Sequence, residues 1–237
     1  MLDDHITPLT IPQKASQQHT MQSAIYLNNR ASSLIEKNCF EKAIETLNQA
    51  RHAVQKIQTK DESSSSSTFE NLPKFSRRPS GKYLSTSNKR RKELDNQEVF
   101  MYSRPLYVSH LPQTEGNRFL SWVIIFNFAL CHHLMALRAA DYKDKHENLL
   151  EALKLYEALV ALPMEDTFQI ETTYFMAMIN NSAQIYQMLH RPRQAKQHAD
   201  QMLSLLMATI QEGEADTVDG FDGFLLNATQ RSLAFAA

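Results

Sequence analysis

The spacing of apolar and small residues between Ile25 and Ala50 predicts two short amphipathic helices that are joined at Asn38-Cys39. In each half these residues recur at steps of three and four, which places them on one helical face. The alanines among them allow the two helices to approach each other closely. The positions are Leu27, Ala31 and Leu34 in the first half, and Phe40, Ala43, Leu47 and Ala50 in the second.

The same spacing recurs twice further along the chain. From Ala31 to Ala43, and again from Ala183 to Ala195, the step between a first-helix and a second-helix alanine is twelve residues. The middle pair is longer, and we assign the extra residues to a polar insertion around Lys143. Three asparagines (Asn29, Asn127, Asn181) begin an Asn-x-Ala triplet in the first helices, and three alanines (Ala43, Ala152, Ala195) recur in the second helices.

This pattern resembles the tetratricopeptide repeat, with a small residue late in the first helix, a turn, an aromatic residue, and alanines in the second helix. The resemblance implies an all-α, TPR-like α-solenoid of about three helix pairs, because stacked pairs build one continuous core. The family's glycine and the proline after the first pair are absent here. The alternative is three unrelated helical hairpins in a generic bundle.

The chain divides into five predicted parts. Residues 98–212 begin with an extended stretch, Val99–Ser109, whose Pro105 favours a short edge strand or a segment lying along the helices. The parts are a disordered leader (1–18), the first helix pair (19–60), a disordered Ser-rich and basic insertion (61–97), the extended stretch with the second and third pairs (98–212), and an acidic link with an apolar C-terminal cap (213–237).

The insertion is predicted to be disordered because it combines few apolar residues with like charges. Its basic residues have the layout of a bipartite nuclear import signal, and Ser80 lies in a context that resembles a basic-directed kinase site. A solvated charge run or a loose contact with nucleic-acid phosphates is the alternative. The import candidates are Arg77, Arg78, Lys89, Arg90, Arg91 and Lys92.

Composition and motifs argue against several other classes. A formal net charge of -1 excludes a uniformly basic nucleic-acid binder, and two cysteines suit a reducing compartment. The apolar run from Trp122 to Leu130 is too short to span a bilayer, and no secretory signal follows Met1. We therefore expect an intracellular, cytoplasmic protein without a membrane association, with nuclear import as a further hypothesis.

No residue set suggests catalysis, a metal or a cofactor. Cys131, His132 and His133 are consecutive, so on a helix they point about 100° apart and cannot share one ion unaided. Cys39 has no histidine partner in the sequence, and no phosphate loop, nucleophile elbow or zinc-helix motif occurs. The chain is therefore not expected to be an enzyme.

The resemblance implies that the first helices line a concave face on which asparagines meet a bound peptide. An amide suits this role because it donates and accepts hydrogen bonds without a charge to desolvate. In the alternative, these asparagines bond to neighbouring helices. The family's carboxylate clamp is not expected, because only Asn127 agrees with it. The predicted peptide-binding residues are Asn28, Asn29, Phe126, Asn127, Leu130, Asn180, Asn181 and Gln184.

These observations predict a non-enzymatic protein-protein interaction module, a scaffold or adaptor that binds an extended peptide or a partner helix on its concave face. The alternative is a nucleic-acid-associated nuclear regulator that uses the basic insertion. Salt dependence separates the two, because phosphate binding weakens steeply with salt and a neutral amide groove does not. The identity of the partner and the oligomeric state are not predicted.

Overall fold

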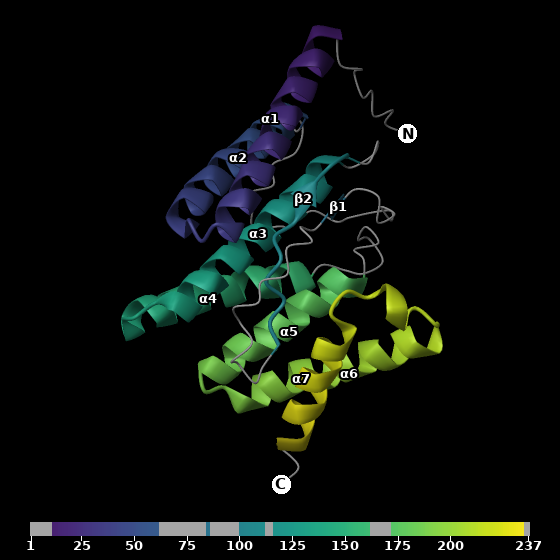
Figure 1. The fold of residues 1–237 in the computed structure, drawn as a ribbon. Helices are drawn as coiled ribbons and strands as arrows, with labels where there is room; N and C mark the ends of the chain where they lie inside the picture. Colours follow the sequence, from purple (N-terminus) through teal and green to yellow (C-terminus); the bar gives the residue numbers. More distant parts are fainter. Residues whose placement is uncertain (1–10, 62–83, 86–99, 112–115, 162–171, 235–237) are drawn as a thin grey trace, which may run out of the picture.

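The computed structural model confirms an all-α protein (Figure 1). It describes residues 11–61, 84–85, 100–111, 116–161 and 172–234. The helices are α1 (Ile11–Glu36), α2 (Phe40–Asp61), α3 (Gly116–Arg138), α4 (Tyr142–Val160), α5 (Thr172–Met188), α6 (Pro192–Gln211) and α7 (Phe221–Ala234). A 3-10 turn, Ala215–Thr217, precedes α7, and two short strands, β1 (Leu84–Ser85) and β2 (Tyr107–Val108), pair with each other.

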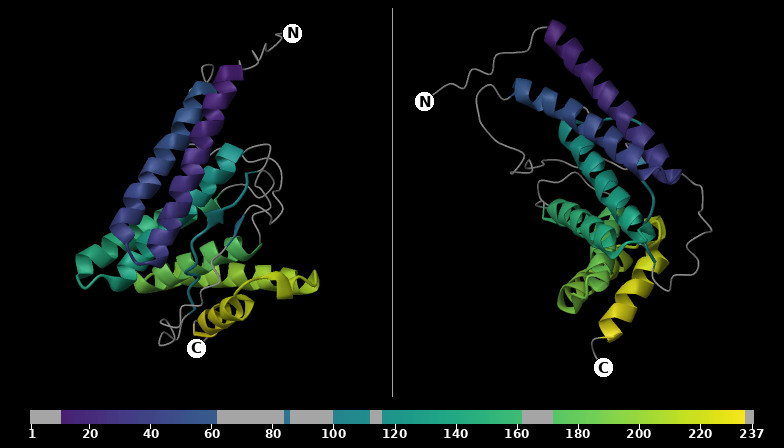
Figure 2. Two further views of the ribbon diagram at one scale, coloured as in Figure 1. Left: turned by 45° about the horizontal axis from the view of Figure 1, so that its top comes forward. Right: turned by 90° about the vertical axis from the view of Figure 1, so that its left-hand side faces the viewer.

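Each α-helix packs against the next one along the chain, so the helices form successive layers. The two views in Figure 2 show α1 and α2 as one hairpin at one end and α7 beside α6 at the other. Three antiparallel pairs result, α1 with α2, α3 with α4, and α5 with α6. The first helices of the pairs, α1, α3 and α5, and then α7, are the ones that carry the asparagines discussed below.

The first and third pairs share one type of turn at one position. Asn38 and His190 both have positive φ, 61° and 56°, and each lies seven residues after the alanine of its Asn-x-Ala triplet. In both turns the following backbone N–H closes on a carbonyl five residues earlier, Cys39 on Leu34 and Arg191 on Tyr186, each at 2.9 Å. This common turn explains why the alanine spacing is the same in these two pairs.

The middle pair differs from the expectation. The residues predicted to be a polar insertion are helical, because the Asp141 carboxylate accepts hydrogen bonds from the N–H groups of Lys143 (2.9 Å) and Asp144 (3.1 Å) and caps α4. The prediction of a disordered leader up to residue 18 is likewise wrong for its last eight residues, since α1 begins at Ile11.

The repeated alanines lie in the core. Ala43, Ala152 and Ala195 are each at most 1% exposed, as their place between closely packed helices requires. Helix α3 is central, and the side chains of Trp122 and Phe126 are almost wholly buried. By length and composition α3 could cross a membrane, but 78% of its apolar stretch is buried by the surrounding chain. The core therefore accounts for its apolar composition.

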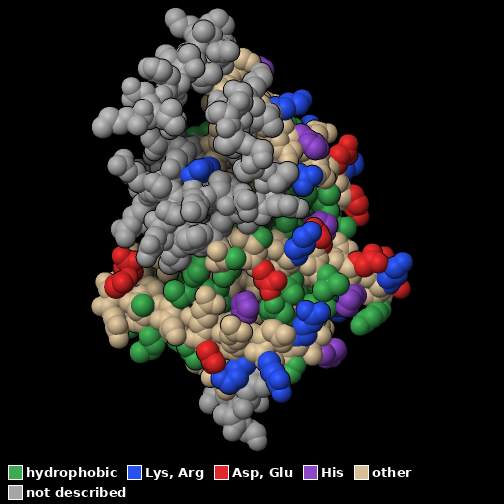
Figure 3. Space-filling view, turned by 180° about the vertical axis from the view of Figure 1, so that it is seen from behind, with side chains coloured by type: hydrophobic (Ala, Val, Ile, Leu, Met, Phe, Trp, Pro, Cys, Tyr) green, Lys and Arg blue, Asp and Glu red, His purple; other side chains and the backbone are tan. Residues whose placement is uncertain are grey.

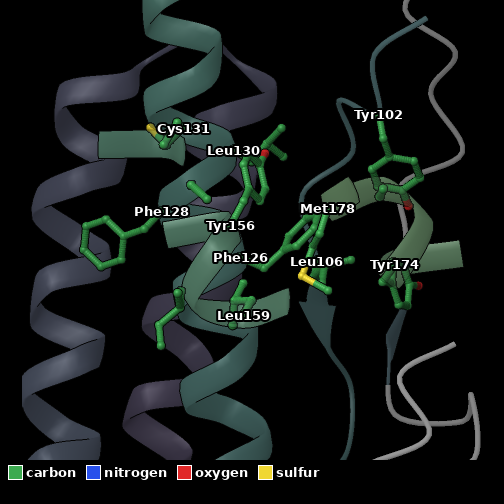
Figure 4. Packing of buried hydrophobic residues seen from close by; sticks show 14 of the residues in the cluster. Tyr102, Leu106, Phe126, Phe128, Leu130, Cys131, Tyr156, Leu159, Tyr174 and Met178 are labelled. Atoms are coloured by element: carbon green, nitrogen blue, oxygen red, sulfur yellow. The ribbon is translucent and has the colours of Figure 1, made fainter. Parts of the chain in front are cut away.

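Residues 100–108, which we call the central segment, are extended and lie against the helices (Figure 4). Tyr102 and Leu106 point into the core, together with Phe126 of α3. At the C-terminal end of the central segment, β2 pairs with β1 in an antiparallel register that places Leu84 opposite Val108. The 61–97 insertion thus contributes β1, and nearly all of its other residues lie outside the described ranges.

Candidate functional site

A row of asparagine side chains binds the backbone of the central segment. The side chain of Asn29 on α1 accepts from the N–H of Val108 and donates to the carbonyl of Val108, both at 2.8 Å. Asn127 on α3 does the same with Leu106, at 2.8 Å to the N–H and 2.9 Å to the carbonyl. Each amide therefore satisfies both backbone groups of a single residue.

Helices α5 and α7 each carry an asparagine that makes the same two-way contact. Asn181 on α5 accepts from the N–H of Tyr102 at 3.2 Å and donates to its carbonyl at 2.9 Å. Asn227 on α7 accepts from the N–H of Phe100 at 3.0 Å and also donates to the carbonyl of Phe100. We call these four residues (Asn29, Asn127, Asn181, Asn227) the asparagine ladder.

The ladder contacts only even-numbered residues because an extended chain turns the backbone groups of successive residues to opposite sides. The chain direction is opposite to the helix order, so α1 holds Val108 and α7 holds Phe100. One even position, Arg104, has no asparagine; its guanidinium forms an ion pair with Asp219 instead. Pro105 is at an odd position of the segment, so its missing N–H removes no bond to the ladder.

A second amide braces the middle of the ladder. Asn28, the neighbour of Asn29, accepts from Asn127 Nδ2 at 3.0 Å and itself donates to the Leu106 carbonyl at 3.1 Å. The Ser32 hydroxyl donates to the same carbonyl at 2.9 Å. These buried bonds hold the Asn127 amide in one rotamer, so it is preorganised for main-chain binding.

The other end of the ladder is braced in the same way. Asn180 accepts from Asn227 Nδ2 at 2.7 Å and donates to the Phe100 carbonyl at 3.1 Å. The Asn181 amide also donates to the Tyr156 hydroxyl at 3.1 Å, so a second helix of a pair, α4, positions this rung. Both braces join helices that are distant in sequence and therefore depend on the correct stacking of the pairs.

Side-chain pockets accompany the main-chain bonds. The Tyr102 ring lies edge-on to Phe126 and stacks with Phe224, with ring centroids 6.4 and 6.3 Å apart. Leu106 and Val108 are at most 1% exposed. The central segment is therefore gripped by its side chains as well as by its backbone.

Phe100 rests on two glycines at the start of α7. A Cβ atom on Gly220, which has a φ of 83°, would lie 2.8 Å from the Phe100 Cζ, and a Cβ on Gly223 would overlap the same ring more severely. The ring also lies edge-on to Phe224, with centroids 5.1 Å apart. Glycine is thus required at both positions by the close approach of Phe100.

Seven of the eight residues predicted to bind peptide are buried, and Asn29 is half-buried. Asn28, Asn29, Asn127, Asn180 and Asn181 all bond to the central segment. Among the other three, Phe126 contacts Tyr102, whereas Leu130 and Gln184 lie within the helix stack. That a partner's peptide binds these residues stays a prediction, since the chain they hold here is its own.

Sequence reasoning missed Asn227 and Tyr156. Asn227 is followed directly by Ala228 and lacks the Asn-x-Ala triplet, so the recurring pattern gives no signal for it. Tyr156 lies on a second helix, where only a side-chain contact reveals its role. The import-signal candidates (Arg77, Arg78, Lys89, Arg90, Arg91, Lys92) and Ser80 lie outside the described residues.

The side chains of the consecutive residues Cys131, His132 and His133 on α3 have different neighbours. The Cys131 thiol contacts the Phe40 carbonyl at 3.5 Å, and His132 Nδ1 bonds to Asn148 Oδ1 at 2.9 Å. His133 is fully buried edge-on to Tyr156, and desolvation lowers its pKa to about 3. Burial raises the pKa of Cys131 to about 12, so its thiolate is disfavoured. Within the described ranges, no group of three or more His, Cys, Asp or Glu residues could hold a metal.

On the face drawn in Figure 3, basic, acidic and histidine side chains of the described residues are interspersed, so this face has no large area of a single charge. The ladder itself is neutral, so main-chain recognition here does not depend on charge. No protein-family model, curated protein or solved structure matches this chain. The resemblance to tetratricopeptide repeats therefore rests on the sequence pattern alone.

Proposed function

We propose that this chain is a non-enzymatic protein-protein interaction module, a TPR-like solenoid whose asparagine ladder binds an extended polypeptide. The observation that carries the proposal is the repeated two-way contact between one asparagine and one backbone residue, made at Val108, Leu106, Tyr102 and Phe100. Four equivalent contacts from four helices form a surface that is complementary to an extended main chain.

The repeat interpretation is supported by local detail. The first and third pairs share the positive-φ turn, at Asn38 and His190, and the ladder residues Asn29, Asn127 and Asn181 occupy one position of the repeated triplet. Main-chain hydrogen bonds supply affinity that is independent of sequence, and side-chain pockets then supply selectivity. This division of roles suits a scaffold or adaptor that recognises a short extended motif.

A partner can use this surface only where the central segment leaves it, because the segment already occupies the ladder. Asn29 is the rung to alter in a test, since it is half-buried and lies at the end of the ladder. Its amide bonds to Val108 and accepts from Asn28 of the same helix at 3.3 Å, so these bonds, unlike those of Asn127, do not join α1 to another helix. Asn48 on α2 is also half-buried and lies outside the ladder, which makes it a matched control.

The experiment is affinity capture with the full-length Leu106→Ala chain, in which the occupying central segment is weakened, alone and combined with Asn29→Ala or with Asn48→Ala. We expect a partner that Leu106→Ala and its combination with Asn48→Ala retain and that its combination with Asn29→Ala loses, because one unpaired main-chain contact costs about 1–3 kcal/mol. With the central segment at full strength, loss of Asn29 would weaken the segment and the partner alike. Equal circular dichroism spectra of the two variants at the temperature of the capture establish that folding is not the cause. The melting temperature of the Asn29→Ala variant should itself fall, because the buried Val108 backbone loses its amide partner. Equal capture by all three chains would place the partner site away from the ladder.

A further inference from the structure

We infer that the groove takes, in trans, an extended segment with apolar side chains at the spacing of the central segment, and that the central segment is its built-in competitor. This inference rests on the proposed function, since it names the ligand class for the same ladder. Its ligand has apolar residues at its first, third, seventh and ninth positions and a cation at the fifth. These correspond to Phe100, Tyr102, Leu106, Val108 and Arg104.

The apolar positions follow from the pockets. Tyr102, Leu106 and Val108 are 3%, 0% and 1% exposed. A polar side chain buried in place of Leu106 or Val108 would lose its hydrogen bonds to water without gaining new partners, which costs free energy. Phe100 fits against Gly220 and Gly223, where any added Cβ would collide with the ring. The spacing is set by the helices, because each apolar residue is also one that the ladder holds by its backbone.

The fifth position selects charge. The Arg104 guanidinium pairs with the Asp219 carboxylate, and the backbone N–H of Asp219 donates to Thr173 Oγ1 at 3.3 Å, which anchors the loop. The two side chains are 36% and 44% exposed, so solvent screens the pair. Its expected contribution to discrimination is therefore small, roughly 1.5- to 5-fold, but its sign is definite.

Competition by the central segment follows from mass action. Val108 is joined to the first residue of α3, Gly116, by seven residues, so its local concentration at the ladder is high. Short tethers give effective concentrations of the order of millimolar. A peptide with micromolar intrinsic affinity is then weakened on the order of a thousandfold in the wild-type chain. Weakening the central segment reveals the groove.

The probe is the synthetic peptide FMYSRPLYV, which has the sequence of residues 100–108. It is titrated against the full wild-type chain and against Leu106→Ala, which removes a fully buried side chain from the competitor only. We expect Leu106→Ala to bind the labelled peptide at least about tenfold more tightly than the wild type does, and to gain melting temperature on binding. Equal affinities, or no binding to a folded Leu106→Ala chain, would overturn the inference.

Two altered peptides test the recognition itself. N-methylation of the leucine amide removes the N–H from which Asn127 Oδ1 accepts a hydrogen bond in the central segment. We expect the affinity of the peptide to fall by about 5- to 150-fold. Glutamate in place of the arginine should weaken binding, and Asp219→Lys should reverse that preference. An N-methylated peptide that binds as tightly as the parent, or a preference that Asp219→Lys leaves unchanged, would contradict the inferred ligand class.

If Leu106→Ala does not fold alone, the readout is the helical circular dichroism signal on addition of the peptide. Recovery of this signal supports exchange of the segment, and absence of recovery contradicts it. Failure of exchange is distinguishable from failure of the proposed function. In the former case the peptide does not enter, whereas in the latter the capture experiment shows no loss of partner when Asn29→Ala is added.

Discussion

The side chain of Asn127 pairs with both backbone groups of Leu106, its Oδ1 lying 2.8 Å from the N–H nitrogen and its Nδ2 lying 2.9 Å from the carbonyl oxygen. Because Asn127 Nδ2 also donates to Asn28 and Ser32, one buried amide connects α3, α1 and the central segment. Helix stacking and main-chain binding therefore depend on the same group. This coupling determines what each substitution below should do.

Replacing Asn127 with alanine should destabilise the fold. The change leaves the buried Leu106 N–H without the Asn127 amide, whereas the Leu106 carbonyl still accepts from Asn28 and Ser32. One unsatisfied buried donor costs about 1–3 kcal/mol. Asn48→Ala, outside the ladder, should change the free energy of unfolding by less than about 0.5 kcal/mol. Urea denaturation of the two variants and the wild type measures both values, and equal midpoints would show that the ladder does not support the fold.

Replacing Tyr156 with phenylalanine should weaken one rung of the ladder while preserving the packing. The Tyr156 hydroxyl accepts from Asn181 Nδ2 at 3.1 Å, and the ring is fully buried. Its loss should cost about 0.5–1.5 kcal/mol. Tyr142→Phe is the matched control, because Tyr142 is 76% exposed. Thermal denaturation should separate the two variants by a few degrees, and coincident melts would mean that α4 does not position Asn181.

Much of the fold follows from local sequence because periodic alanines and apolar residues specify helix faces. Ala43, Ala152 and Ala195 are buried as core residues, and the asparagines share one face. The sequence does not predict that the central segment occupies that face. The pairing of Asn29 with Val108 joins residues 79 positions apart, and such a contact produces no periodic pattern in the sequence. The helical start of α4 was missed because its polar residues depend on the Asp141 cap rather than on an apolar stripe.

Replacing Gly223 with alanine should destabilise the chain, although glycine to alanine inside a helix usually stabilises by about 0.5–1 kcal/mol. The new Cβ would overlap the Phe100 ring, so the ring must move away from α7. Overpacking of this kind costs about 1–3 kcal/mol. The double variant Phe100→Ala with Gly223→Ala removes the overlap. A cycle of unfolding free energies should therefore show strong coupling, and additive effects would show that the ring does not rest there.

Stability should fall as the pH is lowered from neutral, because His133 is buried in its neutral form. Its pKa is lowered to about 3 in the folded chain by desolvation, against about 6.5 when unfolded, so the unfolded state binds the extra proton between these values. The contribution is fully present above pH 6.5 and is lost as the pH falls toward 3. One such group changes the free energy of unfolding by at most about 1.4 kcal/mol per pH unit, or about 2 kcal/mol between pH 6.5 and 5.

His133→Gln removes the titrating group from the same site. Urea denaturation at both pH values should show a smaller pH dependence for this variant than for the wild type. Equal pH dependence in the two chains would assign the acid sensitivity to other groups.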